Sequence, residues 1–450
     1  MSSVAGSAAF STVPASSRAQ QESLLFFFSA FMFRVGLALV TFEQIRPFFG
    51  IQISDYCFFV SLLLLLFRPS SLMLGVRAFG ILLGGALIML GSLLSLLNSA
   101  SPSNAVGPLA RVFVLFGLFA PLAVVHSKNI QKNMLFLLGG IFTNCVITLL
   151  QASLFPGIAD ALSINPTRPD ISEIGRFQGL TSHPNIIGLS GALAGLLGFG
   201  LFSFDGYRRI RGRLTVVIIV CALAALLSGS RAVFVSLVPG VIVLAFFQKQ
   251  RRRAVVRILV ALIVFWGGLT YVAPVVVSQF GERLDSTGSD LYSDYGRLWS
   301  AVYAVQEISQ KPIIGWGIDH IDDAGLTLVP WTGEFVGVHN TFLKYWNAAG
   351  LMGAVGFLTL FAVPVRQILR LLKKEPSNSS TEALVLALAC YALLFIVSNL
   401  GPFDYNRFLY MPLFAFGGFA ASLRTPLEVR WVARHGQGGK IGRSATPLTA

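Results

Sequence analysis

The stretch LLSGSRAVFVSL (residues 226–237) decides the fold, because it joins two apolar runs without a loop of any size. The runs, approximately 214–229 and 232–247, are separated only by Ser228–Arg231. Such a short connection is expected for a hairpin at one face of a membrane, or for a helix that breaks inside it. Broken membrane helices often direct their ends at anionic ligands, so the turn is also a candidate binding site.

The composition of the whole chain is that of a membrane protein. Its 450 residues are 54% hydrophobic and only 12% charged, with a mean hydropathy of +0.72. Soluble proteins carry about 25% charged residues. A span of about 20 apolar residues crosses the hydrocarbon core, where only helices or closed barrels satisfy the backbone. The apolar runs are too long for barrel strands, so we predict an all-α polytopic membrane protein.

The charge pattern sets the predicted topology. Basic clusters such as YRRIRGR (207–213) and RQILRLLKK (366–374) fall on one side of the membrane, and the positive-inside rule makes that side the cytoplasm. Both termini are then cytoplasmic, with a disordered tail over 1–23 and a basic tail over 424–450. The predicted spans, about twelve by length, are 24–43, 53–67, 74–97, 109–125, 134–154, 186–204, 214–229, 232–247, 256–276, 341–365, 382–400 and 407–423.

These spans form two groups around an outer loop. Residues 24–276 are a first bundle of nine spans, 277–338 the outer loop domain, and 339–423 the last three spans. The loop holds nine of the chain's 20 acidic residues. Within it, Leu298, Val302, Val305 and Ile308 recur at helical spacing, and Lys311–Pro312 should end that helix. We therefore expect a folded loop whose amphipathic helix lies on the membrane surface or over the bundle.

Composition also excludes some functions. The net charge of +14 comes from short connections between spans, so we expect no nucleic-acid partner. The four cysteines, Cys57, Cys145, Cys221 and Cys390, lie in apolar runs without metal-ligand spacing and are expected to be small buried hydrophobes. We expect no bound metal and no cofactor.

Several charged and polar residues lie at span ends or in the loop on the predicted outer side, where the positive-inside rule does not explain them. Arginine forks suit phosphate groups, and a histidine can accept a proton near neutral pH. Together they predict a site that holds a diphosphate and deprotonates a hydroxyl. The candidates are Arg176, His183 and Asn185 in GRFQGLTSHPN (175–185), Ser230 and Arg231 in the turn, Arg297 in the loop, and His339 and Asn340 in EFVGVHNTFLKYW (334–346).

Each candidate also has a structural interpretation. His183 and Asn185 stand at a helix start, and Arg231 could snorkel from a tight hairpin. Arg297 could pair with a neighbouring aspartate, and His339 could be an interfacial anchor. Arg77 and Arg111 are interpreted as helix-end or intrahelical contacts, whereas Arg34 and Lys344 have no assigned partner.

The four motifs resemble, in order and spacing, the O-antigen ligase and polymerase superfamily of bacterial membrane proteins. They are GRFQGLTSHPN, LLSGSRAVFVSL, YGRLW followed by KPIIGWG, and HNTFLKYWNAAGLMGAVGF, within roughly 170–365. The resemblance implies a GT-C-like fold in the inner membrane. It also implies metal-independent, inverting transfer of a glycan from undecaprenyl diphosphate to a glycan or to a lipid A–core acceptor. Membrane lipid, a chain-length regulator and a flippase are further candidate partners.

The resemblance assigns His339, Arg231 and Arg297 to catalysis, and adds Arg176 as a further matching arginine. One departure stands out: relatives carry an acidic residue just before the glycine of the last motif, whereas this chain has Asn347-Ala348-Ala349 before Gly350. Between ligase and polymerase, the residues slightly favour a polymerase or exopolysaccharide enzyme, because no lipopolysaccharide-specific feature is visible. A transporter, for bicarbonate or a sugar, and a structural envelope subunit are the alternatives. A transporter would place its polar residues near the midplane, often in repeated halves.

Overall fold

The computed structural model is mostly helical, with 80% of its described residues in helices. A membrane protein needs this because lipid cannot hydrogen-bond an open backbone. The structure describes residues 15–48, 50–67, 78–164, 177–230, 232–247, 289–329, 333, 335–374, 379–401 and 403–423.

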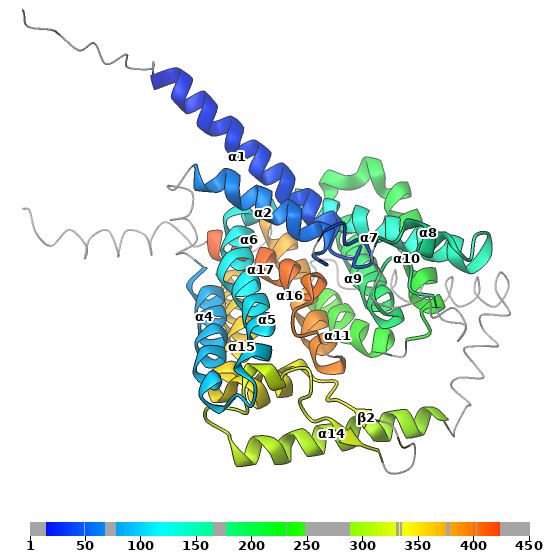
Figure 1. The fold of residues 1–450 in the computed structure, drawn as a ribbon. Helices are drawn as coiled ribbons and strands as arrows, with labels where there is room; N and C mark the ends of the chain where they lie inside the picture. The colour runs from blue at the N-terminus through cyan, green and yellow to red at the C-terminus, as the bar shows by residue number, and fades with distance from the viewer. Residues whose placement is uncertain are drawn as a thin grey trace, which may run out of the picture.

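The first part of the bundle runs from α1 to α11 (Figure 1). α1 and α2 pack together, while α9 packs against α7, α10 and α11. α5, the π-helical segment η3 and α6 follow one another directly along the chain. The elements are α1 (Ala15–Ala38), α2 (Ile53–Leu66), α4 (Phe79–Leu94), η2 (Ser95–Asn98), α5 (Pro102–Val112), η3 (Phe113–Phe119), α6 (Ala120–His126), η4 (Ser127–Asn129), α7 (Ile130–Ser153), α8 (Ile158–Leu162), α9 (Pro184–Ser203), η6 (Asp205–Ile210), α10 (Arg211–Leu227) and α11 (Ala232–Phe247).

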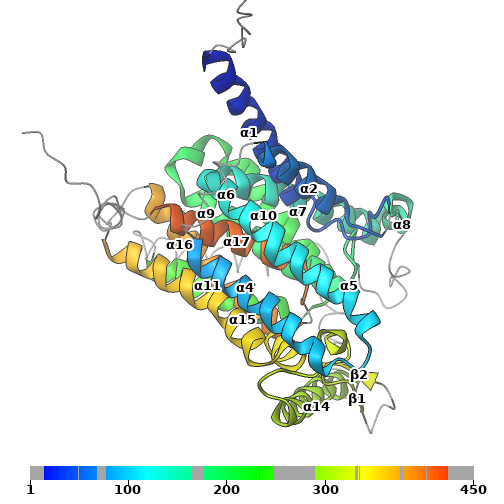
Figure 2. The same cartoon turned by 60° about the vertical axis from the view of Figure 1, so that its left-hand side comes forward.

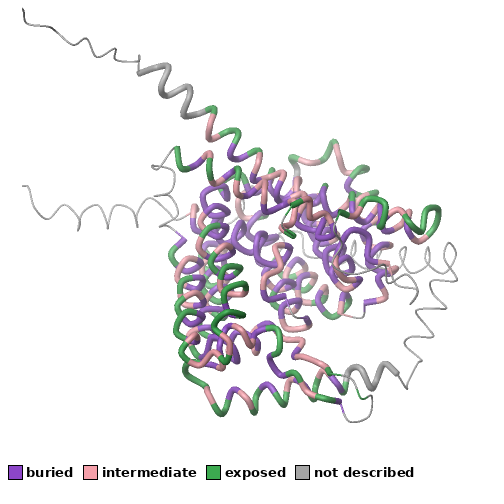
Figure 3. Tube along the Cα trace, viewed as in Figure 1, coloured by how far each residue is buried: buried purple, intermediate pink, exposed green. Residues whose placement is uncertain are grey.

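The last helices supply the centre of the bundle. α17 (Arg407–Ser422) is buried continuously from Phe408 to Ala421, as expected of a helix that is apolar on every side. α16 (Ser379–Leu400) packs on α11 and α15, and α4 lies along α15 (Thr341–Lys374), as Figure 2 shows. Figure 3 shows the buried interior against the exposed outer faces of the peripheral helices.

A small domain covers one end of α15. It contains α14 (Ser289–Gln310), η7 (Ile318–His320) and the antiparallel pair β1 (Thr327–Leu328) and β2 (Phe335–Val336). α14 ends at Gln310, directly before Lys311–Pro312, as the sequence predicts. In Figure 1, α14 lies across the end of the bundle near α15.

A break in α15 anchors this domain. Gly350 has φ 66° inside the helix, a conformation that glycine adopts without a Cβ clash. The break lets Leu351 N donate to Ile313 O at 3.0 Å, while Trp316 N donates to Asn347 O at 2.8 Å. Glu307 of α14 adds a hydrogen bond from Asn347 Nδ2 at 2.7 Å. The KPIIGWG segment is thus joined to an unwound turn of a membrane helix.

The helices agree with most predicted spans and correct some details. Every predicted span contains a helix except 256–276, which lies outside the described residues. Among the described residues, six helical segments are long and apolar enough to cross a membrane. The shorter apolar helices are 24–38, 53–66 and 232–247. α1 begins at Ala15, inside the segment predicted as a tail, because the Ala, Arg, Gln and Glu residues there favour helix.

The apolar stripe of α14 faces away from the bundle. Leu298, Val302 and Val305 are exposed, and of the predicted stripe only Ile308 is buried. Small residues, Ser300 and Ala304, form the face that packs inward. α14 thus lies over the end of the bundle, one of its two predicted positions, with the first three residues of its apolar stripe facing outward.

Candidate active site

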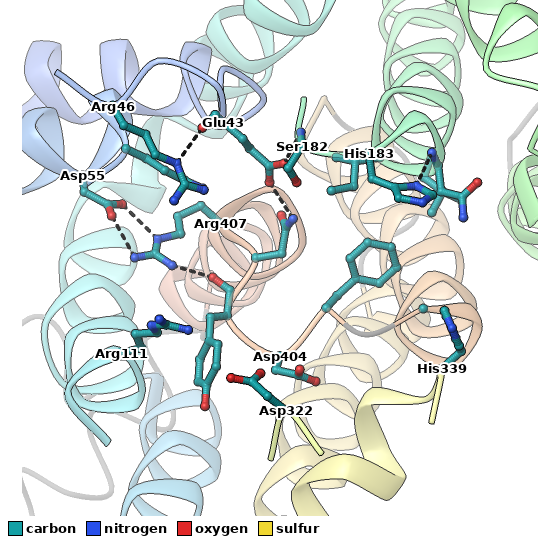
Figure 4. A pocket seen from close by; sticks show the side chains of 18 of the residues that line it. Glu43, Arg46, Asp55, Arg111, Ser182, His183, Asp322, His339, Asp404 and Arg407 are labelled. Atoms are coloured by element: carbon teal, nitrogen blue, oxygen red, sulfur yellow. Dashed lines mark hydrogen bonds and ion pairs between the residues drawn. The ribbon is translucent and has the colours of Figure 1, made fainter. Parts of the chain in front are cut away.

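A cavity of about 790 Å³ lies where several helices end. Its walls come from the α1–α2 connection, the starts of α2, α9, α11 and α17, and the end of α16. The predicted topology assigns all these helix ends to the outer face of the membrane. In Figure 4, Arg46, Arg111 and Arg407 lie on one side of the cavity and His183 and His339 on the other.

Glu43 joins three segments at the upper wall of this cavity in Figure 4. Its Oε2 accepts hydrogen bonds from the backbone N and Oγ of Ser182, at 2.9 and 2.5 Å. Its Oε1 accepts one from Asn406 Nδ2 at 2.7 Å. Asn144 on α7 adds a further contact: its Oδ1 accepts a hydrogen bond from Leu180 N at 2.8 Å, which fixes the segment before α9. The buried carboxylate therefore has several donors, as buried charge requires.

A bidentate ion pair forms the wall next to Glu43 in Figure 4. Arg407 Nε and Nη2 donate to Asp55 Oδ1 and Oδ2 at 2.9 and 2.8 Å. Arg407 Nη1 also donates to Tyr405 O at 2.6 Å. The Arg111 guanidinium lies 5.5 Å above the centre of the Tyr405 ring. Arg111 lies in the last turn of α5, in agreement with its interpretation as a helix-end residue, and its side chain also lines the cavity.

Lys344 finds its partner in a residue 60 positions away. Its Nζ lies 2.8 Å from Asp404 Oδ2, and both side chains are buried. The Tyr345 hydroxyl donates to the backbone carbonyl of Asp404, which fixes the loop before α17. Burial raises the pKa of Asp404, and Lys344 opposes this shift. Asp404 Oδ1 has no hydrogen-bond partner among the described residues, so one buried acceptor in the cavity wall is unused.

His339 is held neutral by its surroundings. Burial, together with the positive charges of Arg297 and Lys344, lowers the pKa of His339 to about 4. At neutral pH its imidazole is therefore uncharged and has a lone pair that accepts a hydrogen bond or a proton. Arg297, on α14, thus belongs to the electrostatic environment of the histidine.

The remaining predicted residues have mixed positions. His183 and Asn185 line the cavity, and His183 Nδ1 also caps α9 by accepting from Asn185 N at 3.0 Å. Asn340 Oδ1 instead caps α15 through Leu343 N at 3.0 Å. Ser230 is buried, and its backbone N donates to Ser228 Oγ at 3.2 Å.

Two predicted arginines, Arg176 and Arg231, lie outside the described residues. Their described neighbours are close to the site. Phe177 N donates to Leu227 O at 3.4 Å, so the segment before α9 meets the turn after α10. Ala232, directly after the turn, lines the cavity.

Sequence reasoning missed Glu43, Arg46, Asp55, Asp404 and Arg407. A signal was present for the arginines: each is a single basic residue on the outer side of the predicted topology, the property that singled out Arg231 and Arg297. Within the described ranges, His, Cys, Asp and Glu side chains form no group of three that could hold a metal ion.

Comparison with known proteins gives one finding. Residues 216–358 match the family model described as O-antigen ligase. The matched range contains most of α10, all of α11 and α14, and the first half of α15, and therefore both Arg297 and His339. This match confirms the resemblance to the O-antigen ligase and polymerase family. Among curated proteins no significant match is found.

Proposed function

We propose that this chain, whose residues 216–358 match the O-antigen ligase family model, transfers a lipid-linked glycan to an acceptor hydroxyl at the outer face of the cytoplasmic membrane. It would act as an O-antigen ligase or as a polysaccharide polymerase. The observation that carries this proposal is the cavity at the membrane-helix ends, where neutral His339 lies across from three arginines and the unpartnered Asp404 oxygen lines the same cavity.

The proposed setting follows the predicted topology. The donor is a glycan on undecaprenyl diphosphate, and twelve spans of a GT-C-like fold leave both termini in the cytoplasm. The cavity then faces the outer leaflet, and α14 directs its exposed apolar stripe at the membrane surface. Packing on a lipid surface would bury that stripe, which the bundle itself leaves uncovered.

The proposed reaction is a direct displacement at the anomeric carbon. The acceptor oxygen forms the new bond from the face opposite the diphosphate, so the anomeric configuration inverts. The electrons of the broken C–O bond leave with the lipid diphosphate, whose negative charge Arg297 and Arg231 stabilise. The acceptor proton passes to the lone pair of His339. In this proposal, arginines stabilise the negative charge of the leaving diphosphate, as a divalent metal does in other phosphate-releasing enzymes.

Asp404 completes the acceptor site in this proposal. Its Oδ1 is buried and unpartnered, and an unpaired buried acceptor costs free energy that a donated hydrogen bond recovers. A sugar hydroxyl supplies such a donor. The carboxylate that relatives place before the glycine of the last motif would then have a functional counterpart on the loop before α17, rather than on α15.

Complementation of a deletion strain tests the proposal. His339→Gln and Arg297→Gln should each abolish surface polysaccharide while protein abundance in the membrane stays normal. Arg366→Gln is the matched control, because Arg366 is exposed near the far end of α15. Polymer stranded on the lipid carrier would identify a ligase, and single repeat units would identify a polymerase. Normal polysaccharide from both variants would rule out the proposed chemistry.

A further inference from the structure

Two polar atoms in the cavity wall are buried and have no partner. Asp404 and Tyr405 are consecutive in the loop before α17, and both line the cavity. Asp404 Oδ1 and the Tyr405 hydroxyl are each shielded from solvent without making a hydrogen bond to the described residues. Most buried polar groups in proteins are hydrogen-bonded, and one left unpaired costs free energy. The fold alone gives no reason for this pair.

The other oxygens of these two residues hold them in place. Asp404 Oδ2 accepts a hydrogen bond from Lys344 Nζ at 2.8 Å, and the Asp404 carbonyl accepts one from the Tyr345 hydroxyl. The Tyr405 carbonyl accepts one from Arg407 Nη1 at 2.6 Å. The two unpartnered atoms therefore belong to a segment that is already fixed. A fixed pair of polar atoms suits a ligand, because little ordering has to accompany binding.

The two atoms have opposite roles in a hydrogen bond. Burial, with the negative charges of Asp404 and Asp322, raises the pKa of Tyr405, so its hydroxyl keeps a proton to donate. Asp404 Oδ1 belongs to the carboxylate that is paired with Lys344, and it accepts. A ligand that satisfies both atoms must donate to one and accept from the other. Sugar hydroxyl groups do both.

The charge balance beside this pair disfavours an ionic ligand. In Figure 4, Asp322 and Asp404 lie together at the lower side of the cavity. The charges that shift the pKa values of Asp404 and Tyr405 come from these two carboxylates and from two cations, Lys344 and Arg111. An added phosphate, carboxylate or ammonium group would find no free counter-ion among them, and unpaired charge is costly in a buried site. An uncharged group is the remaining fit.

We infer that Asp404 Oδ1 and the Tyr405 hydroxyl form a two-point site that binds two hydroxyl groups of an uncharged acceptor sugar. This inference rests on the proposed function and specifies its acceptor: the sugar that receives the glycan carries neither an acid nor an amine at the bound positions. A third hydroxyl, the reacting one, is directed to His339, which lines the same cavity. Tyr405 is then an acceptor-binding residue, and Asp322 excludes acidic sugars.

Binding of soluble glycosides to the full-length protein in phosphatidylcholine nanodiscs tests the inference. The probes are methyl glucoside and methyl galactoside, which are uncharged, methyl glucuronoside as the acid, and methyl glucosaminide as the amine. The variants are Asp322→Asn and Tyr405→Phe, which loses only the hydroxyl and keeps the ring against Arg111. Tyr207→Phe is the matched control, because Tyr207 lies in η6 and is not part of the cavity lining.

The wild type should bind the uncharged glycosides more tightly than either charged probe. Tyr405→Phe should weaken that binding by about two- to tenfold, as expected for the loss of one hydrogen bond. The unfolding temperature of Tyr405→Phe should not fall, because the hydroxyl has no partner in the free protein. Asp322→Asn should improve binding of the glucuronoside, since it removes a negative charge. In a transfer assay, Tyr405→Phe should raise KM for the acceptor more than it lowers kcat.

The inference is overturned if no uncharged glycoside binds the wild type, or if a charged probe binds it more tightly. It is also overturned if Tyr405→Phe binds every probe as the wild type does, or if Asp322→Asn leaves binding of the glucuronoside unchanged. A lower unfolding temperature for Tyr405→Phe would assign the hydroxyl a structural partner instead. The transfer assay separates these failures from a failure of the proposed function, because the latter appears as absence of product from the wild-type protein.

Discussion

Lys344→Met should destabilise the protein strongly, and more at alkaline than at acidic pH. The side chains of Lys344 and Asp404 are only 6% and 5% exposed, with Nζ and Oδ2 2.8 Å apart. Solvent therefore screens this pair little. Removing one partner of a buried pair costs about 3–5 kcal/mol, because the other charge stays buried without compensation. After the substitution, neither Asp404 oxygen would have a side-chain partner, since Oδ1 has none already.

The pH dependence follows from the remaining carboxylate. Burial already raises the pKa of Asp404 above 3.8, and Lys344 is the cation that restrains it. Without Lys344 the folded-state pKa rises further, so the folded protein binds a proton that the unfolded chain releases. Stability then falls as pH rises from the unfolded value through the folded value. At low pH the carboxyl group is neutral, and most of the loss should disappear.

Thermal unfolding in detergent at pH 5 and pH 8 measures the effect. The double variant Lys344→Met/Asp404→Asn should be more stable than Lys344→Met alone, because it buries no unpaired charge. Lys132→Met, at an exposed lysine, is the control and should change little. The reasoning is refuted if the stability losses of Lys344→Met and of Asp404→Asn, measured separately, add up in the double variant. It is also refuted if Lys344→Met loses the same stability at both pH values.

Three further results are expected. The pH profile of kcat/KM should lose activity on the acid side near pH 4, where free His339 titrates; an acid limb near its ordinary value would contradict the lowered pKa. Gly350→Ala should lower the unfolding temperature, because the new Cβ would lie 2.1 Å from Ile313 O and the backbone has a φ of 66°. Gly139→Ala is the control: its Cβ would meet no atom within 4 Å, and the unfolding temperature should not change. EDTA should leave the transfer rate unchanged if arginines stabilise the leaving diphosphate, and loss of activity that Mg²⁺ restores would exclude that mechanism.

The parts of the fold that follow from local sequence were predictable. Apolar length located the helices, and Lys311–Pro312 located the end of α14, because both signals act within a few residues. The break in α15 was not predicted, although Gly350 was visible in the sequence. Its cause is non-local: the Ile313 carbonyl occupies the space where a side chain would stand. Only the packed structure shows that a distant loop requires glycine there.

The candidate site shows the same limit. His339, His183 and Asn185 were found because a charged or polar residue at a span end stands out in an apolar chain. The pairs Lys344–Asp404 and Arg407–Asp55 join residues far apart in sequence, and no local pattern connects them. Sequence reasoning left Lys344 without a partner and gave the other three residues no role, although the predicted topology placed all four at the same face.

The lowered pKa of His339 gives the proposed reaction an order of events. With the cavity empty of substrate, burial and then the charges of Arg297 and Lys344 disfavour a charged imidazole, so the histidine is a poor proton acceptor. A donor diphosphate beside Arg297 brings negative charge that offsets these cations and raises the pKa of His339 towards its ordinary value of 6.5. The acid limb of kcat, which reports the substrate complex, should therefore lie at higher pH than that of kcat/KM. Basicity would then appear only when the donor is in place, so the acceptor hydroxyl is activated at the moment when a leaving group is present to be displaced.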